Sequence, residues 1–350
     1  MLDASTGQLR IVSLLPAATE IVAALGLADR LVGRSHECDE PAAVATLPAL
    51  TAPRIDPAAS SREIHEQVGR ALEGTAAPDQ AAGATCSTGP STTLYTLDID
   101  RLAALKPSLI LTQAACEVCA ISAADVEEAV RKAGVHTRVL ALSPQTLADV
   151  FRDVLAVGAA TGTLAKAREV VARLTARCDS VACRVTAMRA GERQAEARPT
   201  VAVIEWLDPP MAAGNWVPEL VRLAGGEDLL GKAGAHSHWI TWDDVAAADP
   251  DVVLLVPCGF TLPRVVAEAA SPAVRPQLER LRAFREGRCF AVDGHTLFNR
   301  PGPRLVESLE VLAGLLHPGE FRFAATRQFA RSIASSLGPA AASPTSDQRA

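Results

Sequence analysis

The sequence predicts an α/β protein with two similar lobes, each built on a parallel sheet and joined by a long helical segment. Short buried strands alternate with amphipathic helices in both halves of the chain, an order typical of parallel sheets that helices cover on both faces. A helical pattern over residues 145–188 separates the halves and contains no strand. Several segments of the first half also recur, in the same order, in the second.

The first half shows a clear succession of elements. Pro16 ends the opening strand, and Gly26 supplies a C-terminal stop for the helix that follows. Residues 51–93 are rich in Ala, Pro, Gly, Ser and Thr, which predicts a partly mobile surface insertion around one helix. The elements predicted for this half are strand 10–15, helix 17–25, apolar run 31–33, helix 61–72, helix 100–105, strand 108–112, helix 123–133 and strand 135–140.

The second half begins after the long helical pattern, which Gly158 and Gly162 are expected to weaken locally. Its predicted elements are strand 200–205, helix 217–224, helix 242–248, strand 251–256, strand 289–292 and helix 304–316. From Gly319 onward the chain is rich in Ala and Ser and is expected to end in a frayed, partly disordered tail. We expect a first lobe at residues 1–144, a linking helix region at 145–192, a second lobe at 193–318 and a tail at 319–350.

The recurrence is strongest between residues 100–107 and 243–250, which have the same spacing from an aspartate to a proline. A buried strand is predicted after each of them. A weaker match joins residues 20–33 to residues 219–231, and the second copy is one residue shorter. The pattern favours an internal duplication, although any two α/β units share some of these features.

Length, charge and composition narrow the class of partner. A chain of 350 residues suits two domains, and a net charge of -6 without a basic stripe argues against nucleic acid or an anionic membrane. No run of about 18 apolar residues occurs, and the first residues lack the features of a signal peptide. We expect a cytoplasmic monomer as written, or a periplasmic one if the start site is mis-assigned. The 8 cysteines are too few for a disulfide scaffold and are expected to be thiols.

Ligands of open parallel sheets bind beyond the carboxyl ends of the strands, so the loops there form the candidate site. Trp206, Trp216 and Trp239 lie in such loops, and their flat rings can cover a planar macrocycle. Packing in the base of the second lobe is the alternative. The residues that we expect to bind a ligand are Pro16, Thr19, His36, Glu37, Cys38, Gln113, Trp206, Trp216, Trp239, Phe298 and Arg300.

Two loops carry candidate metal ligands. His36 and Cys38 flank Glu37 in one loop, and Cys116 and Cys119 form a C-x-x-C pair beside a strand end. A histidine or thiolate there suits cobalt, iron or zinc, and the cysteine pair suits a metal or a redox couple. A hydrogen-bonding histidine and small buried thiols are the alternatives. No G-x-x-x-x-G-K-[ST], G-x-S-x-G or H-E-x-x-H motif occurs, which argues against the common nucleotide, hydrolase and zincin chemistry.

Six segments together resemble the solute-binding proteins for vitamin B12, haem and iron-siderophores. They are residues 10–20, 36–41, 105–110, 218–226, 249–253 and 299–304. The resemblance implies two Rossmann-like lobes bridged by one rigid backbone helix, with a ligand cleft between them. It also implies a cobalamin-type ligand stacked between loop aromatics, without catalysis. The chain departs from the secreted B12 binders at residues 36–38 and 116–119, where aromatic-bearing loops are expected, and it shows no secretion signal.

The resemblance also implies a membrane partner. In the importing members a carboxylate on each lobe docks onto basic residues of a permease. Asp100 and Asp243 occupy matching positions here, at the starts of the duplicated helices. The alternative is that they are simple helix N-terminal acids, which the helix dipole favours.

Three functions follow, and we favour the first. It is non-catalytic binding of cobalamin, or a related corrinoid or metal chelate, as the substrate-binding protein of an ABC importer or a cytoplasmic relative. The second is a cytoplasmic metal or metallocofactor handler that uses Cys116, Cys119, Cys38 and His36, in which a processing activity stays open. The third is a thiol-redox protein built on Cys116 and Cys119.

Overall fold

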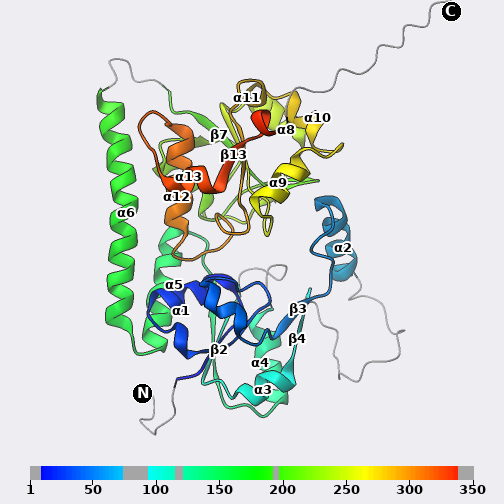
Figure 1. Ribbon diagram of the computed structural model, residues 1–350, viewed down its shortest axis with the longest axis vertical. Helices are drawn as coiled ribbons and strands as arrows, with labels where there is room; N and C mark the ends of the chain where they lie inside the picture. The colour runs from blue at the N-terminus through cyan, green and yellow to red at the C-terminus, as the bar shows by residue number, and fades with distance from the viewer. Residues whose placement is uncertain (1–8, 74–93, 115–120, 192–196, 338–350) are drawn as a thin grey trace, which may run out of the picture.

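The computed structural model describes residues 9–73, 94–114, 121–191 and 197–337. These residues form two α/β lobes stacked along the long axis of the molecule, and helix α6 (Leu164–Gly191) runs beside both (Figure 1). The predicted architecture of two lobes and one long backbone helix is therefore confirmed. Within these residues, no helix combines the length and the apolar character that crossing a bilayer requires.

The first lobe contains these strands and helices: β1 (Ile11–Ser13), α1 (Pro16–Ala24), η1 (Ala28–Arg30), β2 (Leu31–Arg34), η2 (Ala42–Thr46), β3 (Thr51–Pro53), β4 (Tyr95–Leu97), α3 (Ile99–Leu105), β5 (Leu109–Gln113), α4 (Ala123–Lys132) and β6 (Arg138–Leu142). Its main sheet is parallel throughout and has the order β2-β1-β5-β6. Ile11 and Ile110, on the two central strands, are fully buried because helices cover both faces of the sheet. β3 and β4 form a separate antiparallel pair of strands.

The second lobe contains these strands and helices: β7 (Thr200–Leu207), β8 (Pro210–Ala212), α7 (Val217–Leu223), β9 (Glu227–Asp228), β10 (His238–Trp239), α8 (Trp242–Ala248), β11 (Val252–Leu255), α9 (Leu262–Ala269), α10 (Arg275–Glu279), α11 (Arg282–Arg285), β12 (Cys289–Val292) and α12 (Leu305–Leu316). The central strands β7, β11 and β12 are parallel, as predicted. β8 and β10 add antiparallel strands on one side, which sequence reasoning missed because each is only two or three residues long.

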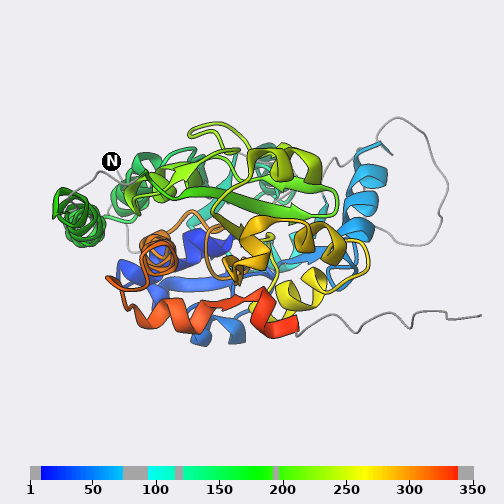
Figure 2. The same ribbon diagram turned by 90° about the horizontal axis from the view of Figure 1, so that it is seen from above.

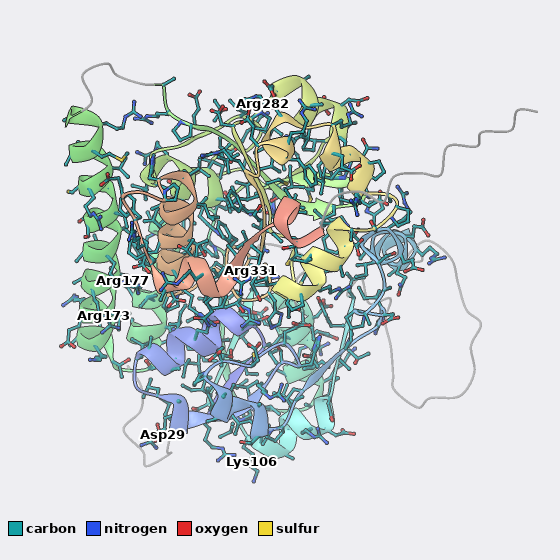
Figure 3. The ribbon with its side chains drawn as sticks, turned by 45° about the horizontal axis from the view of Figure 1, so that its top comes forward. Asp29, Lys106, Arg173, Arg177, Arg282 and Arg331 are labelled. Atoms are coloured by element: carbon teal, nitrogen blue, oxygen red, sulfur yellow. The ribbon has the colours of Figure 1, made fainter. Side chains whose placement is uncertain are left out.

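The duplicated segments adopt the same structure in both lobes. α3 and α8 each end at a non-glycine residue in the left-handed region, Lys106 at φ 45° and Asp249 at φ 43°. A proline follows each of them and disfavours the right-handed helical conformation of the residue before it, so the helix stops and the chain enters a buried strand. Lys106 lies at the end of the molecule that the first lobe forms (Figure 3).

The linking region is two helices rather than the single helical stretch predicted over residues 145–188. α5 (Leu147–Ala160) and α6 form a hairpin, with Gly162 at φ 75° in the turn between them. Gly158 permits their close approach, since a Cβ there would lie 2.4 Å from the Cβ of Ala167. Arg177 of α6 then binds Glu310 of α12 at 2.8 Å and joins the backbone helix to the second lobe (Figure 3).

Regular structure continues beyond residue 319, as far as residue 337, in the stretch that was predicted to end in a frayed, partly disordered tail. The chain forms α13 (Ala324–Phe329), β13 (Ala330–Ser332) and α14 (Ile333–Leu337), and β13 pairs with β12. Ile333 is fully buried in the second lobe, so apolar spacing outweighs the Ala- and Ser-rich composition. We propose lobe boundaries at residues 144 and 193, with the second lobe extending to residue 337. Residues 338–350 lie outside the described residues.

The helix predicted within the insertion is present as α2 (Ser61–Glu73), but it is not a detached surface feature. Its Ile64 is 8% exposed and belongs to an apolar cluster of the second lobe. Seen from above, α2 lies at the edge of the molecule opposite α6 (Figure 2). Residues 74–93, the last part of the insertion predicted over residues 51–93, lie outside the described residues.

Candidate binding site between the lobes

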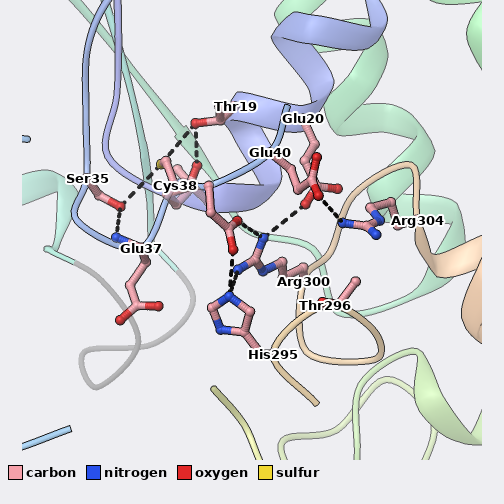
Figure 4. A network of polar contacts seen from close by, with 12 residues as sticks. Thr19, Glu20, Ser35, Glu37, Cys38, Glu40, His295, Thr296, Arg300 and Arg304 are labelled. Carbon is pink, nitrogen blue, oxygen red and sulfur yellow. Dashed lines mark hydrogen bonds and ion pairs between the residues drawn. The ribbon is translucent and has the colours of Figure 1, made fainter. Parts of the chain in front are cut away.

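Loops from the two lobes meet at an ion pair. Asp39 follows β2 of the first lobe, and Arg300 and His295 follow β12 of the second. Arg300 Nη1 donates to Asp39 Oδ1 at 2.6 Å, and His295 Nε2 lies 2.6 Å from Asp39 Oδ2 (Figure 4). The carboxyl ends of parallel strands from both sheets therefore face one another here, as expected for a ligand site of this architecture.

Glu20 of α1 is a second, more deeply buried partner of Arg300. Arg300 Nη1 lies 3.3 Å from Glu20 Oε1, and both side chains are about 6–7% exposed. Glu20 Oε2 has no hydrogen-bond partner among the described residues. Burial raises the pKa of the Glu20 carboxyl to about 7, although the charge of Arg300 opposes that rise. A carboxyl with one unpartnered buried oxygen is stabilised by keeping its proton.

Asp39 behaves in the opposite way. Burial favours its neutral form, but hydrogen bonds from His295 and Arg300 outweigh burial and hold the pKa of Asp39 well below its usual range. His295 Nε2 also lies 2.8 Å from Arg300 Nη2. One ring nitrogen cannot donate to Asp39 and accept from Arg300 at once. Because an ionised carboxylate can only accept, Nε2 donates to Asp39 and does not accept from Arg300.

A shell of hydroxyl groups holds the Asp39 loop against α1. Thr19 Oγ1 donates to Ser13 Oγ at 2.8 Å and contacts Cys38 Sγ at 3.0 Å, and Ser35 Oγ lies 3.2 Å from the same sulfur. Burial raises the pKa of the Cys38 thiol, so the sulfur stays protonated and serves as a small hydrogen-bonding group. The contact between Thr19 and Cys38 therefore anchors the Asp39 loop to α1.

His36 points into its own lobe. Its Nδ1 lies 2.7 Å from Thr51 Oγ1, and its ring packs 5.3 Å from the ring of Tyr95 on β4. Nε2 is at ion-pair distance, 3.4 Å, from Glu37 Oε1 but makes no hydrogen bond among the described residues. The close polar contact with His36 lowers the pKa of Glu37, so the Glu37 side chain, 40% exposed, presents a carboxylate at this edge.

The loop that carries Arg300 is fixed from within the second lobe. Trp216, the N-cap residue of α7, is 7% exposed and its Nε1 donates to Phe298 O at 2.7 Å. Phe298 is fully buried at φ 64°, and Asn299 Nδ2 donates to Val256 O at 2.8 Å. Trp216 and Phe298 therefore hold the loop in place. Their indole and phenyl faces are turned into the protein.

The remaining predicted site residues lie elsewhere. Trp206 and Trp239 contact α2 instead of the Asp39 loop. Pro16 begins α1, and Gln113, half-buried, ends β5. All of the predicted ligand-binding residues, these four included, remain predictions as ligand contacts.

The predicted metal ligands are not brought together in the described part of the chain. Cys38 and His36 have separate hydrogen-bond partners, and no group of three or more His, Cys, Asp or Glu side chains suited to a metal occurs among the described residues. Cys116 and Cys119 lie outside the described residues, so that pair remains a prediction.

Sequence reasoning missed four residues of the interlobe cluster: Glu20, Asp39, His295 and Arg304. Asp39 and His295 stand in loops that follow strands, but Asp39 lies 256 residues from His295 and 261 residues from Arg300 in the chain. Charged residues in a loop after a strand, such as Asp39, and at the start of α12, such as Arg304, could have indicated a polar cluster between the lobes. Arg304 lies 3.8 Å from Glu40 and forms a further ion pair between the lobes with it.

Gly294 sets the position of the loop that carries His295 and Arg300. A Cβ at residue 294 would lie 2.2 Å from Pro257 O and 2.7 Å from Val256 O, both of them backbone atoms that cannot rotate away. Gly294→Ala is therefore expected to lower the free energy of unfolding by about 1–3 kcal/mol, measured by urea unfolding. Gly319→Ala, where nothing lies within 4 Å of the added Cβ, is the control. Equal stability of the two variants would contradict this role of Gly294.

Comparison with known proteins agrees with the fold and the family resemblance. The sequence profile of the family described as periplasmic binding protein matches residues 11–294. The uncharacterised ABC transporter substrate-binding lipoprotein YvrC of Bacillus subtilis (strain 168) is 23% identical over 318 residues, which cover 89% of this chain and 81% of the relative.

Solved structures give the same fold. A periplasmic haem-binding protein from Pseudomonas aeruginosa superposes with a TM-score of 0.65 at 20% identity, covering 90% of this chain and 95% of that one. The periplasmic vitamin B12-binding protein BtuF of Vibrio cholerae superposes with a TM-score of 0.58 at 18% identity, covering 88% and 96%. At these identities the likeness shows the architecture, and the ligand has to be argued from the residues of the site.

Proposed function

The chain belongs to the periplasmic binding protein family, and we propose that it binds a cobalamin or related corrinoid between its lobes for an ABC importer. The observation that carries the proposal is the contact of Asp39 with Arg300 and His295, because it brings loops from both sheets to one place. A ligand between the lobes would meet polar groups of both. The similarity to substrate-binding, haem-binding and B12-binding proteins supports the same role.

The charges around this contact favour a corrinoid over haem. The more accessible side chains are carboxylates: Glu37, Asp39 and Glu40 are 40%, 44% and 48% exposed, whereas Arg300 is 7% exposed. Haem carries two carboxylates, which such a surface repels. The peripheral amides of a corrinoid are neutral and donate hydrogen bonds to carboxylates, so the exposed carboxylates discriminate between the two ligands by charge.

The proposed importer role includes a permease and a place outside the cytoplasm, like the relatives that are named as periplasmic proteins or lipoproteins. Asp100 and Asp243 are proposed as the docking carboxylates. Both are exposed near the N-termini of the duplicated helices α3 and α8, which lie at opposite ends of the molecule on the side away from α6 (Figure 1). Asp243 also binds Arg280 within the second lobe, and a permease would compete with that ion pair.

Cyanocobalamin is expected to bind and to raise the melting temperature, and haemin is expected to bind more weakly. At a concentration 100 times its Kd, a ligand stabilises the folded chain by about 2.7 kcal/mol, which thermal unfolding detects readily. Titration followed by absorption and tryptophan fluorescence gives the Kd. Tighter binding of haemin would overturn the corrinoid assignment, and no stabilisation by either compound would overturn the binding role.

Glu37→Ala tests the place of binding. It removes an accessible acceptor and is expected to weaken cyanocobalamin about three- to tenfold, the value of one hydrogen bond. Asp29→Ala, whose carboxylate is 70% exposed on η1 of the first lobe, is the matched control and should leave the Kd unchanged. An unchanged Kd in the Glu37 variant would place the ligand elsewhere.

A further inference from the structure

Residues 55–68 connect the first lobe to the second at a place other than the linking helices. The chain leaves the first lobe at β3, where Arg54 N still donates to Leu94 O at 2.8 Å beside the paired strands β3 and β4. It then crosses to the second lobe and begins α2 there. We call residues 55–68 the clasp.

Polar contacts hold the start of α2 on the second lobe. Ser61 N donates to Glu268 Oε1 of α9 at 2.9 Å, and Ser61 Oγ donates to the same oxygen. Arg62 Nε donates to Asp208 Oδ2 at 2.9 Å, and its Nη2 binds the other carboxylate oxygen. Because Ser61 is fully buried and paired with a carboxylate, separating these groups leaves hydrogen-bonding atoms without partners.

The second lobe also grips the backbone of the clasp before α2 begins. Arg264 of α9 donates from Nη1 to Pro57 O at 2.5 Å and from Nη2 to Ala59 O at 2.6 Å. The same guanidinium lies 3.5 Å from the ring centroid of Phe260. One arginine thus fixes two carbonyls of a segment that has no regular secondary structure of its own.

Apolar and aromatic contacts complete the attachment. Ile64 is 8% exposed and inserts into the cluster that the buried residues of β7, β11 and α9 form. Trp206 Nε1 donates to Ser61 O at 3.1 Å, and the ring of His65 meets Trp239 edge-on at 4.8 Å. These contacts account for two of the tryptophans that the sequence placed in loops of the second lobe.

The position of the clasp gives it a mechanical consequence. α6 runs along one side of both lobes, and α2 lies on the opposite side of the molecule in both views (Figures 1 and 2). Two bodies joined along one side can rock about that joint, and a second tie at the far edge removes this freedom. We propose that the clasp fixes the separation of the lobes and must release before a ligand passes between them; the part about ligands rests on the proposed function.

Ile64→Asp tests the proposal by placing a carboxylate in the apolar cluster. Hydrogen–deuterium exchange of the ligand-free variant is expected to speed up at least tenfold at residues 61–71. Exchange should also speed up at the interlobe loops, residues 36–40 and 294–300, while β11 stays protected. Glu66→Asp is the control, because it puts aspartate at an exposed position of the same helix.

Arg264→Gln is the milder second variant if Ile64→Asp unfolds the chain. It removes the hydrogen bonds to Pro57 and Ala59. Hydrogen–deuterium exchange is expected to speed up at the same residues as in Ile64→Asp, but by a smaller factor. Faster exchange in α2 with unchanged exchange at the interlobe loops would overturn the proposal, whether or not a ligand is known. With cyanocobalamin bound, its dissociation rate should rise about tenfold in Ile64→Asp. An unchanged dissociation rate would overturn the claim that the clasp must release before a ligand passes between the lobes. Failure of the parent chain to bind cyanocobalamin or haemin would overturn the proposed function alone.

Discussion

Replacing Arg300 by methionine is expected to lower the free energy of unfolding by about 3–5 kcal/mol at pH 8, the usual loss when one partner of a buried ion pair is removed. Arg300 is 7% exposed and binds both Asp39 and Glu20. Without the guanidinium, Asp39 keeps only His295, and Glu20 loses the nearest cation. Urea unfolding at pH 8 and pH 5 measures the loss.

Arg300→Met should lose less unfolding free energy at pH 5 than at pH 8, because of the ionisation of Glu20. Its pKa of about 7 rises further when Arg300 is absent, so at pH 5 the carboxyl is neutral in both proteins and only the Asp39 pair is lost. Arg282→Met is the control, because Arg282 is 34% exposed, pairs with Asp249 and Asp251 at the surface, and should contribute about 1 kcal/mol or less. Equal losses in the two variants would show that the interlobe pair does not stabilise the protein.

The elements that sequence reasoning placed well are those whose signals are local. The predicted helix 242–248 coincides with α8, because Thr241 and Asp244 form a capping box at its start and Asp249 and Pro250 end it. The predicted strand 289–292 coincides with β12, a buried run between a glycine-containing turn and Asp293. Caps and breakers lie within a few residues of the element that they bound, so one sequence suffices to find them.

The interlobe cluster could not be assembled in this way. Thr19, Cys38 and Arg300 were chosen individually, as polar residues at strand ends. Nothing local shows that Arg300 binds Asp39, 261 residues earlier, because that contact depends on how the two lobes face each other. The clasp escaped prediction for a related reason. Its composition is that of a mobile loop, and only the second lobe offers partners for Ile64 and Ser61.

The tryptophans show the limit of arguing from residue type. Flat rings near strand ends suit a macrocycle, but they also suit any apolar neighbour that the fold supplies. The indole N–H of Trp216 donates to Phe298 O and supports the Arg300 loop, whereas the indole N–H of Trp206 donates to Ser61 O of the clasp. Trp216 thus holds the loop of the candidate site and Trp206 holds the clasp, and both contacts follow from three-dimensional packing.

Glu20→Gln is expected to stabilise the protein at pH 8 by up to about 3 kcal/mol, the value of a pKa raised from 4.5 to about 7. Because the folded chain holds this proton more tightly than the unfolded chain, the parent protein loses stability as pH rises from about 4.5 to 7. Glutamine keeps the shape of the neutral acid and cannot ionise. The difference in unfolding free energy between variant and parent should therefore be small at pH 4.5, grow up to pH 7 and then level off.

The measurement has to be this difference, because another buried acid titrates in the same window. Burial raises the pKa of Asp153 on α5 to about 6, and its slope is present in both proteins and cancels. A difference that stays flat between pH 4.5 and 7 would mean that Glu20 is ionised throughout. Arg300 would then hold two carboxylates together across the lobes, and Glu20→Gln would destabilise the chain at every pH above 4.5.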